Sequence, residues 1–374
     1  MTERISCMDR AYSVTSNRRT RPVARTAVHP GAAGQSRWNP VQAGLAFLLL
    51  LAVLLLASTS LQAQNGTAGA FTRMGFGARG QGMGNALSTV NTGTIATYYN
   101  PALSAFQEGH VFRGSYSFLA LDRKFNQVSY TQTIRIYDEE ARVYADEPGV
   151  QSISGISVGW INAGDADIQG YDSDGFKTDM LSVFENQFYA NFGTRFSDRL
   201  AVGFSAKFYY SGVYEDITSS GFGLDIGALY MVSSSLRIAL VAQELLTKYQ
   251  WDTSDLYGAE RGNSTEDPFA RIFRLGIGYT LPSESGLASA EIEQIDGDVY
   301  MARLGVEVPV AENIALRGGV ERLDLSDMGI DPRPTIGFSV SQPVAQMQPI
   351  IHYAFILEPV APSPTHVLSF ALHF

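Results

Sequence analysis

The chain has 374 residues, of which 45% are hydrophobic and only 17% charged, and its formal net charge is −10. The charged fraction is below the roughly 25% of soluble globular domains, while a mean hydropathy of −0.01 is too low for a bundle of membrane helices. The many aliphatic and aromatic residues exclude a disordered chain, and the acidic balance excludes a general nucleic-acid binder.

The N-terminus has the layout of a secretory signal peptide. An uncharged apolar run at residues 43–57 is too short to span a bilayer as a helix, and it follows a segment with seven arginines. Small residues up to Ala63 predict cleavage after that position, so residues 1–63 form a signal peptide with a long basic N-region. A signal anchor that stays attached is the alternative. Cleavage would remove the one cysteine, Cys7, and, with seven arginines against two acids, would change the net charge from −10 to −15.

Residues 64–108 do not alternate in polarity, and they carry an ordered set of short motifs. These are Gly69-Ala70-Phe71, Met74-Gly75-x-Gly77-Ala78-Arg79, Met83-Gly84-x-Ala86 and Tyr98-Tyr99-Asn100-Pro101-Ala102. The series resembles the start of the PorV/PorQ family of outer-membrane barrels, which is similar in turn to FadL-type transporters of hydrophobic compounds. One departure is the stretch 91–94, Asn-Thr-Gly-Thr, where members of that family usually carry acidic residues.

The resemblance implies that residues 64–108 form a small N-terminal plug inside a fourteen-stranded barrel. Its motif residues are Gly75, Gly77, Arg79, Met83, Gly84, Asn100, Pro101 and Ala102. Because Arg79 stands in an apolar stretch, it needs a carboxylate or carbonyl partner in the lumen, for which Asp225, Glu307 and Glu321 are candidates. The simplest role for this arginine is to pin the plug in place. Asn100-Pro101 favours a turn or helix start leading toward the first strand.

From residue 109 to residue 374, apolar residues recur at every second position. The segment 199–211, for example, places Leu, Val, Phe and Ala on one face and Ala, Gly, Ser and Lys on the other. Such alternation predicts strands with one apolar and one polar face. We expect fourteen strands, with twelve as the alternative count. The expected ranges are 109–120, 125–137, 151–161, 186–196, 199–211, 219–231, 235–244, 269–281, 286–294, 299–308, 312–322, 334–341, 346–357 and 365–374.

The position of the charges decides between a membrane barrel and a soluble sandwich. Charges in these strands fall on the small, polar face, where they would line a lumen; they include Lys207, Asp225, Arg237, Arg274, Arg303, Glu307, Arg317 and Glu321. The opposite face is apolar, as lipid requires, because a charge at the bilayer midplane costs about 2–4 kcal/mol. The sequence therefore predicts an all-β fold, a transmembrane antiparallel β-barrel over residues 109–374.

Connections between the expected strands alternate in length over most of the series, which is typical of short periplasmic turns and longer outer loops. The outer loops 162–185 and 245–268 are expected to cap the lumen. Their aromatic residues would line a ligand pocket, or else pack within the loops or contact the lipid headgroup zone; they are Phe176, Phe184, Tyr249 and Trp251.

The chain ends on an alternating strand, with Phe370 and Phe374 on its apolar face. This end resembles the C-terminal aromatic signal of bacterial outer-membrane proteins. It implies the barrel-assembly machinery as a partner.

Some residue patterns are typical of enzymes or metal sites, but the surrounding sequence lacks the features that such sites require. Residues 75–80 match G-x-G-x-x-G but open no βαβ unit, so we expect no dinucleotide cofactor. An aspartate cluster within 165–174 lacks the spacing of an EF-hand and is expected to be a solvated loop, with a calcium bridge to lipopolysaccharide as the alternative. No Ser/His/Asp set has a nucleophile motif. We expect no catalytic residues, no metal site and no cofactor, hence no enzyme.

Two functions stay open at this stage. The PorV/PorQ resemblance implies a link to type IX protein secretion or surface attachment, with secretion components as partners. The similarity to FadL-type proteins implies passive transport of a hydrophobic ligand across the outer membrane, and a purely structural barrel is a third possibility. In each case we expect a protein of the cell outer membrane that contacts lipid and lipopolysaccharide and binds no nucleic acid.

Overall fold

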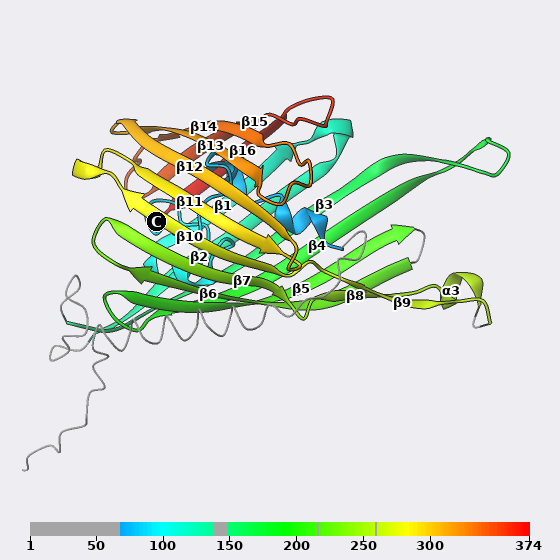
Figure 1. Cartoon of the computed structure of the whole chain (residues 1–374), viewed down its shortest axis with the longest axis horizontal. Coiled ribbons are helices and arrows are strands. Elements are labelled where there is room, and N and C mark those ends of the chain that lie inside the picture. The colour runs from blue at the N-terminus through cyan, green and yellow to red at the C-terminus, as the bar shows by residue number, and fades with distance from the viewer. Residues whose placement is uncertain (1–67, 138–148, 215–216, 259) are drawn as a thin grey trace, which may run out of the picture. The chain divides into compact units, whose positions relative to one another are not determined.

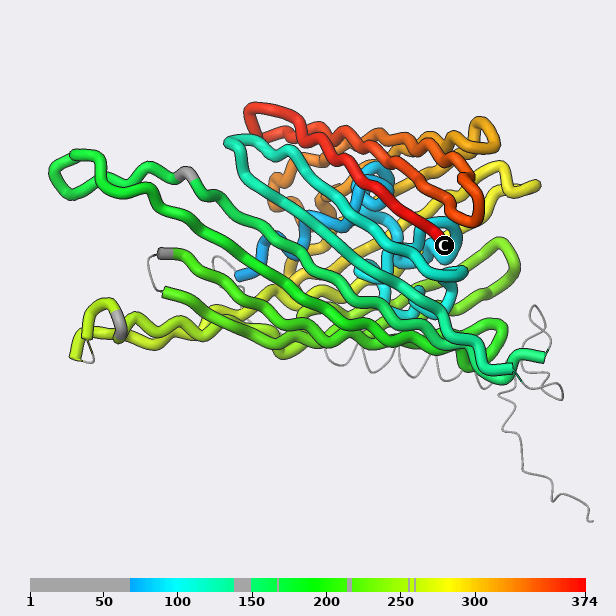
Figure 2. Tube along the Cα trace, turned by 180° about the vertical axis from the view of Figure 1, so that it is seen from behind, coloured from blue at the N-terminus to red at the C-terminus, as the bar shows by residue number. Residues whose placement is uncertain are grey.

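The computed structural model describes residues 68–137, 149–214, 217–258 and 260–374, and these form a closed antiparallel barrel of fourteen strands (Figures 1 and 2). Neighbouring strands follow each other in sequence, except that β7 pairs directly with β10 and that β1 pairs with β16 to close the ring. The barrel strands are β1 (His110–Phe118), β2 (Lys124–Tyr137), β3 (Val150–Tyr171), β4 (Lys177–Arg195), β5 (Leu200–Tyr214), β6 (Ile217–Met231), β7 (Leu236–Leu245), β10 (Ile272–Thr280), β11 (Leu287–Ile295), β12 (Val299–Ala311), β13 (Ile314–Asp324), β14 (Arg333–Ser341), β15 (Gln348–Ile356) and β16 (Thr365–His373). The expected transmembrane barrel with fourteen strands is confirmed.

The alternation of the sequence separates an apolar outer face from a polar lumen. Phe204, Leu304 and Leu368 are about half exposed on the outer face. The charged side chains that face the lumen, such as Lys207 and Arg274, are buried inside the barrel. The apolar outer face suits contact with lipid chains. No helix in the described ranges is long and apolar enough to cross a membrane.

The first and last strands close the barrel along one seam. β1 pairs with β16 from Val111 opposite His373 to Phe118 opposite His366. At the end of the seam, His110 and Phe374 exchange two backbone hydrogen bonds of 3.1 and 3.0 Å, and their rings stack at 5.5 Å. This pairing joins the first strand to the last, so the sheet closes into a ring.

Two long hairpins project from the same end of the barrel (Figures 1 and 2). One is β3–β4, whose turn covers only residues 172–176; the other is the insertion between β7 and β10, which holds β8 (Lys248–Asp252), α3 (Ser254–Tyr257) and β9 (Ser264–Pro268). Since outer loops are the longer ones in such barrels, we take this end as the outer end. Short 3₁₀ turns, η3 (Ala120–Asp122) and η4 (Pro282–Glu284), connect two other strand pairs.

The expectation of a loop over 162–185 is therefore wrong, because most of this segment is paired strand. Register shifts between Asp165 and Ile168 and between Gln169 and Tyr171 interrupt the ladder. Bulges of this kind break the period of two on which the strand assignment rested. The outer connections 119–123 and 296–298 are also short, so long outer loops occur at only part of the rim.

Residues 68–108, called the plug below, lie inside the barrel. They contain η1 (Ala70–Arg73), α2 (Gly77–Gly82) and η2 (Pro101–Phe106). Helix α2 packs against β13 to β16 and β1, whereas η2 packs against β2 to β6 on the other wall. Ala68 forms a bridge with Phe269 near the outer end, and the plug leads into His110 at the inner end. The plug thus crosses the lumen from end to end; the signal peptide expected at residues 1–63 lies outside the described residues.

A β-bulge between β6 and β7 turns an additional charged side chain into the lumen. Between β6 and β7 the pairing passes from Leu224–Leu245 to Ile226–Ala242, so that two residues of β7 face Asp225. One of them is Glu244, whose φ of 59° lies in the left-handed region. Strict alternation would place this carboxylate on the lipid side, and the bulge places it inside instead.

Candidate functional site

The Asn100-Pro101-Ala102 motif starts η2 and seats it on the barrel wall. The Asn100 side chain accepts a hydrogen bond of 3.0 Å from the Ala102 amide and donates one of 3.2 Å to the carbonyl of Ala228 on β6. Pro101 occupies the first helical position, where its missing N–H costs nothing. A Cβ added at Gly203 would lie 2.5 Å from the Ala102 nitrogen, so η2 meets this wall backbone to backbone.

The start of α2 is held by β2 and by β16, which lie on opposite sides of the seam. Gly77 donates a backbone hydrogen bond of 2.6 Å to the side chain of Gln127 on β2, and the same side chain donates one of 2.6 Å to the Gly75 carbonyl. The amide of Ala78 donates to the hydroxyl of Ser369 on β16 at 2.7 Å. The plug therefore contacts both sides of the closure.

Met83 and Gly84, after α2, press against β12 and β13. Gly84 has a φ of 59°, and an added Cβ would lie 2.7 Å from the Leu304 carbonyl oxygen and from the Val320 nitrogen. A Cβ at Gly305 would lie 2.4 Å from the carbonyl oxygen of Met83. Since real Cβ contacts are never so close, only glycine fits at these positions, and the plug closes tightly on this wall.

Arg79 binds Glu307, one of the three carboxylates expected for it. Its Nη2 and Nε lie 2.7 and 2.9 Å from the two oxygens of Glu307, and its Nη1 donates to the carbonyls of Thr92 and Thr94 at 2.7 and 3.0 Å. Glu307 also accepts from Arg317 of β13 at 2.5 Å. One carboxylate thus balances two guanidinium groups between the plug and the wall.

Glu321, a second candidate for Arg79, belongs to a different network. It accepts a hydrogen bond from Asn85 of the plug and forms an ion pair with Arg333, which also contacts Glu358. Asn85 is held in turn by the hydroxyl of Tyr99, which donates to its side-chain oxygen at 2.5 Å. Burial raises the pKa of Tyr99 above its usual value, so this phenol keeps its proton.

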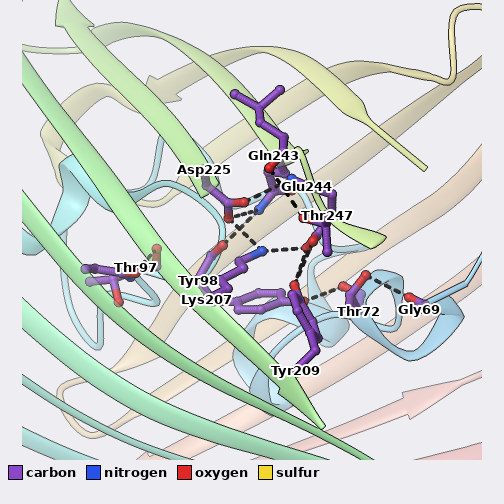
Figure 3. Close-up of polar contacts among 12 residues, drawn as sticks. Gly69, Thr72, Thr97, Tyr98, Lys207, Tyr209, Asp225, Gln243, Glu244 and Thr247 are labelled. Atoms are coloured by element: carbon purple, nitrogen blue, oxygen red, sulfur yellow. Dashed lines mark hydrogen bonds and ion pairs between the residues drawn. The ribbon is translucent and has the colours of Figure 1, made fainter. Parts of the chain in front are cut away.

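Asp225, the third candidate, lies at the opposite wall and pairs with Lys207 (Figure 3). The Lys207 ammonium lies 2.7 Å from Asp225 and 2.6 Å from Glu244, and the hydroxyl of Tyr209 lies 2.7 Å from the second oxygen of Glu244. All four side chains are buried. The plug joins this network through Tyr98, whose ring centroid is 5.5 Å from the Lys207 ammonium.

Charges on β10 to β12 form a further buried ladder. Arg274 lies 3.3 Å from Glu291 and 3.0 Å from Glu293, and Glu293 lies 2.7 Å from Arg303. Arg237 stands apart near the inner end, where it donates to the hydroxyl of Thr280 at 2.9 Å.

Sequence reasoning singled out Lys207, Asp225 and the arginines but missed several of their partners; these are Glu244, Glu291, Glu293 and Arg333. The alternation with Ala290 and Ile292 could have revealed the two carboxylates of β11. No local signal marks Glu244, since its orientation depends on the bulge.

An aromatic cluster fills the lumen beside β4 to β7. Phe269 lies 4.7 Å from Tyr209 and 4.9 Å from Tyr249, measured between ring centroids, and Trp251 lies 5.3 Å from Tyr249. Phe71 of the plug meets Tyr209 edge-on at 6.3 Å. Tyr249 and Trp251 therefore pack within this cluster, which is the loop packing left open for them, and Phe71 is the plug residue that meets it.

The other two aromatic residues expected over the lumen lie elsewhere. Phe176 is 71% exposed at the turn between β3 and β4. Phe184 packs on Tyr210 with ring centroids 5.4 Å apart, and it shares the strand face of the exposed Phe188. Neither ring lines a pocket over the lumen, because β3 and β4 continue as paired strands up to the turn at residues 172–176.

Two cavities border the plug on the opposite side of the lumen. The outer one, of about 330 Å³, lies between η1 and strands β11 to β14 and is lined in part by Met74, Met301 and Ile330. The inner one, of about 180 Å³, lies between the plug and strands β12 to β15 and is bordered by Arg79 and His352. The described residues hold no group of His, Cys, Asp and Glu side chains placed to bind a metal ion.

Several solved structures share this architecture. The Ralstonia pickettii toluene transporter TbuX matches with a TM-score of 0.52 and 14% identity over 82% of this chain and 100% of its own. The monoaromatic hydrocarbon channel CymD matches with a TM-score of 0.54 and 14% identity over 80% and 98%. The P. putida toluene transporter TodX matches with a TM-score of 0.52 and 11% identity over 80% and 99%. The chain shares the fold of these three barrels.

At this level of identity the likeness establishes the fold and supports an outer-membrane location. No family model and no curated protein matches the sequence. The resemblance of residues 69–102 to the PorV/PorQ family therefore stays a hypothesis. Cleavage of the signal peptide also stays a prediction.

Proposed function

We propose that the protein is a passive channel for small hydrophobic compounds across the outer membrane. The observation that carries this proposal is the pair of cavities at the two ends of a plug within a closed barrel. Solved barrels of this fold include two toluene transporters and a monoaromatic hydrocarbon channel, which supports the same ligand class here.

The cavities have a suitable size for compact ligands. An enclosed apolar cavity of about 150 Å³ is enough to hold benzene. The cavities here are larger, at about 330 and 180 Å³. The outer cavity combines the apolar side chains of Met74, Met301 and Ile330 with guanidinium groups, a mixture typical of ligand pockets. The outer cavity therefore has the size and the apolar side chains for one monoaromatic molecule, whereas the inner one is bordered mainly by polar and charged groups.

The proposal is tested by uptake of radiolabelled toluene into intact bacteria that express the protein in their outer membrane. The control strain carries the empty vector, and the amount of folded protein is measured by its heat-modifiable band on a gel. We expect faster initial uptake in the expressing strain. Equal rates at a verified level of folded protein would contradict the proposal.

Secretion is a separate hypothesis that rests only on the motif at residues 69–102. It predicts that deleting the gene in its native host removes a set of secreted proteins sharing one C-terminal domain. Unchanged secreted and surface proteins would exclude the secretion hypothesis. That outcome would leave the proposal of a hydrocarbon channel untouched.

A further inference from the structure

Arg113 on β1 is a buried lumen arginine that contacts hydroxyl groups and no carboxylate among the described residues. Its Nε and Nη2 donate to the hydroxyls of Ser129 and Thr131 at 3.2 and 2.9 Å. Its Nη1 has no hydrogen-bond partner in the part of the chain that the structure describes, and the residue is only 8% exposed. Because buried charges in proteins are normally paired, this guanidinium lacks a counter-charge.

A small cavity borders this guanidinium, between the plug and the strands beside the seam. It measures about 20 Å³, and its lining includes Arg113 and Ser115 of β1, His352 of β15, and Arg79 and Thr94 of the plug. None of the described residues that line it is an acid. A water molecule needs roughly 10–15 Å³ in such a cavity, so the space fits one water molecule or one small monatomic ion.

His352 brings a second donor to the same cavity. Its side chain is buried, and its Nε2 lies 3.4 Å from the Thr94 hydroxyl. Its Nδ1 has no hydrogen-bond partner among the described residues. When Nε2 accepts the hydroxyl proton of Thr94, the ring proton lies on Nδ1, which is then a donor. Nη1 of Arg113 and Nδ1 of His352 are therefore two buried groups beside one cavity that can donate to a bound ion.

The charges around the cavity are not balanced by the described residues. Arg79 and Arg317 share the carboxylate of Glu307, and Arg113 adds a third guanidinium. Three positive charges thus stand against one negative charge. Glu312 borders the neighbouring inner cavity, but it is exposed and does not line the small one. A small anion would supply a missing negative charge and accept hydrogen bonds from both donors.

We propose that this cavity binds one small monatomic anion, such as chloride, between Arg113 and His352. The inner cavity shares Arg79, Thr94 and His352 with it, so the ion enters from the inner end of the barrel. Its small volume excludes larger anions such as phosphate. The bound ion is the counter-charge that lets the plug, with Arg79, dock beside Arg113. This role goes beyond the proposed channel function and does not depend on it.

The first test measures the thermal midpoint of the heat-modifiable band in detergent, while chloride replaces gluconate at constant ionic strength. A ligand that binds only the folded state stabilises it with the logarithm of its concentration above Kd. We therefore expect the midpoint of the wild type to rise with the logarithm of chloride or bromide concentration and to show no such rise with phosphate. The midpoint of Arg113→Met should not depend on chloride.

The matched control is Arg237→Gln. Arg237 is also buried and also donates to a hydroxyl, that of Thr280, but it does not line the cavity. This variant should keep the chloride dependence of the wild type. An equal response to chloride in the wild type, Arg113→Met and the control would be a general salt effect and would overturn the site.

A second measurement needs only the wild-type protein, so it decides even if Arg113→Met fails to fold. Crystals are grown in bromide, and anomalous diffraction locates the bound ions. We expect an anomalous peak within hydrogen-bond distance of Nη1 of Arg113 and Nδ1 of His352. Density at this position without anomalous signal would show that water fills the cavity, and it would overturn the proposal.

Discussion

Replacing Glu307 by Gln should release the plug from the wall far more than its small change in shape suggests. The carboxylate pairs with Arg79 and Arg317, whose side chains are only 7% and 3% exposed. Glu307→Gln keeps the hydrogen-bonding shape but leaves two guanidinium charges facing each other without their carboxylate. Removing one partner of a buried ion pair costs about 3–5 kcal/mol. At about 1.4 kcal/mol per factor of ten, the undocked population should rise roughly 10²- to 3 × 10³-fold.

The assay is limited trypsin digestion of the folded protein in detergent, with cleavage followed after Arg73 and Arg79 of the plug. When opening is fast, the rate of cleavage reports the population of the undocked state. Glu312→Gln, an exposed acid near the same end, is the matched control and should leave the rate unchanged. A cleavage rate for Glu307→Gln within about threefold of the wild type, less than 1 kcal/mol, would refute the reasoning.

Substitutions at three other places test the packing of the lumen and the wall. Lys207→Met leaves two buried carboxylates facing each other and should lower the folding stability by about 3–5 kcal/mol. Glu244→Gln should lower the stability less, because Lys207 keeps its other carboxylate, Asp225. The thermal midpoint of the heat-modifiable band is measured for both variants. Gly84→Ala adds left-handed backbone strain and overpacking against two strands, together about 2–5 kcal/mol. It should therefore increase trypsin cleavage of the plug. Gly114→Ala is the control, because its Cβ meets nothing within 4 Å, and it should leave the cleavage rate unchanged. Leu304→Arg places a charge on the lipid face and should cost about 2–4 kcal/mol, seen as a lower yield of folding into lipid vesicles than for Leu304→Ala.

Most of the barrel could be predicted from sequence, because each strand has one face in lipid and one in the lumen. That constraint writes a period of two directly into the chain, and the expected ranges for β5, β6 and β10 differ from the observed ones by only a few residues. The pattern failed where bulges occur, in the outer parts of β3 and β4 and at Glu244. A bulge shifts the period by one residue, and period alone cannot tell this shift from a loop.

The partners of the lumen charges could not be chosen from sequence. Three carboxylates were equally suitable for Arg79, and only the position of α2 relative to β12 brings Glu307 within 2.7 Å. That position depends on contacts far apart in the chain, such as Gly84 with Leu304 and Ala78 with Ser369. The local sequence pattern carries no information about how the plug is oriented inside the barrel.

The seam between β1 and β16 closes the barrel and also holds the plug. The plug precedes β1 and is enclosed by a ring that only the last strand completes. Ser369 of that strand accepts a hydrogen bond from Ala78 and donates one to Ser115 of β1, so the same hydroxyl touches the plug and the first strand. Closing the ring and docking α2 therefore share one hydroxyl, so a defect in the seam at Ser369 also disturbs the contact between the plug and the wall.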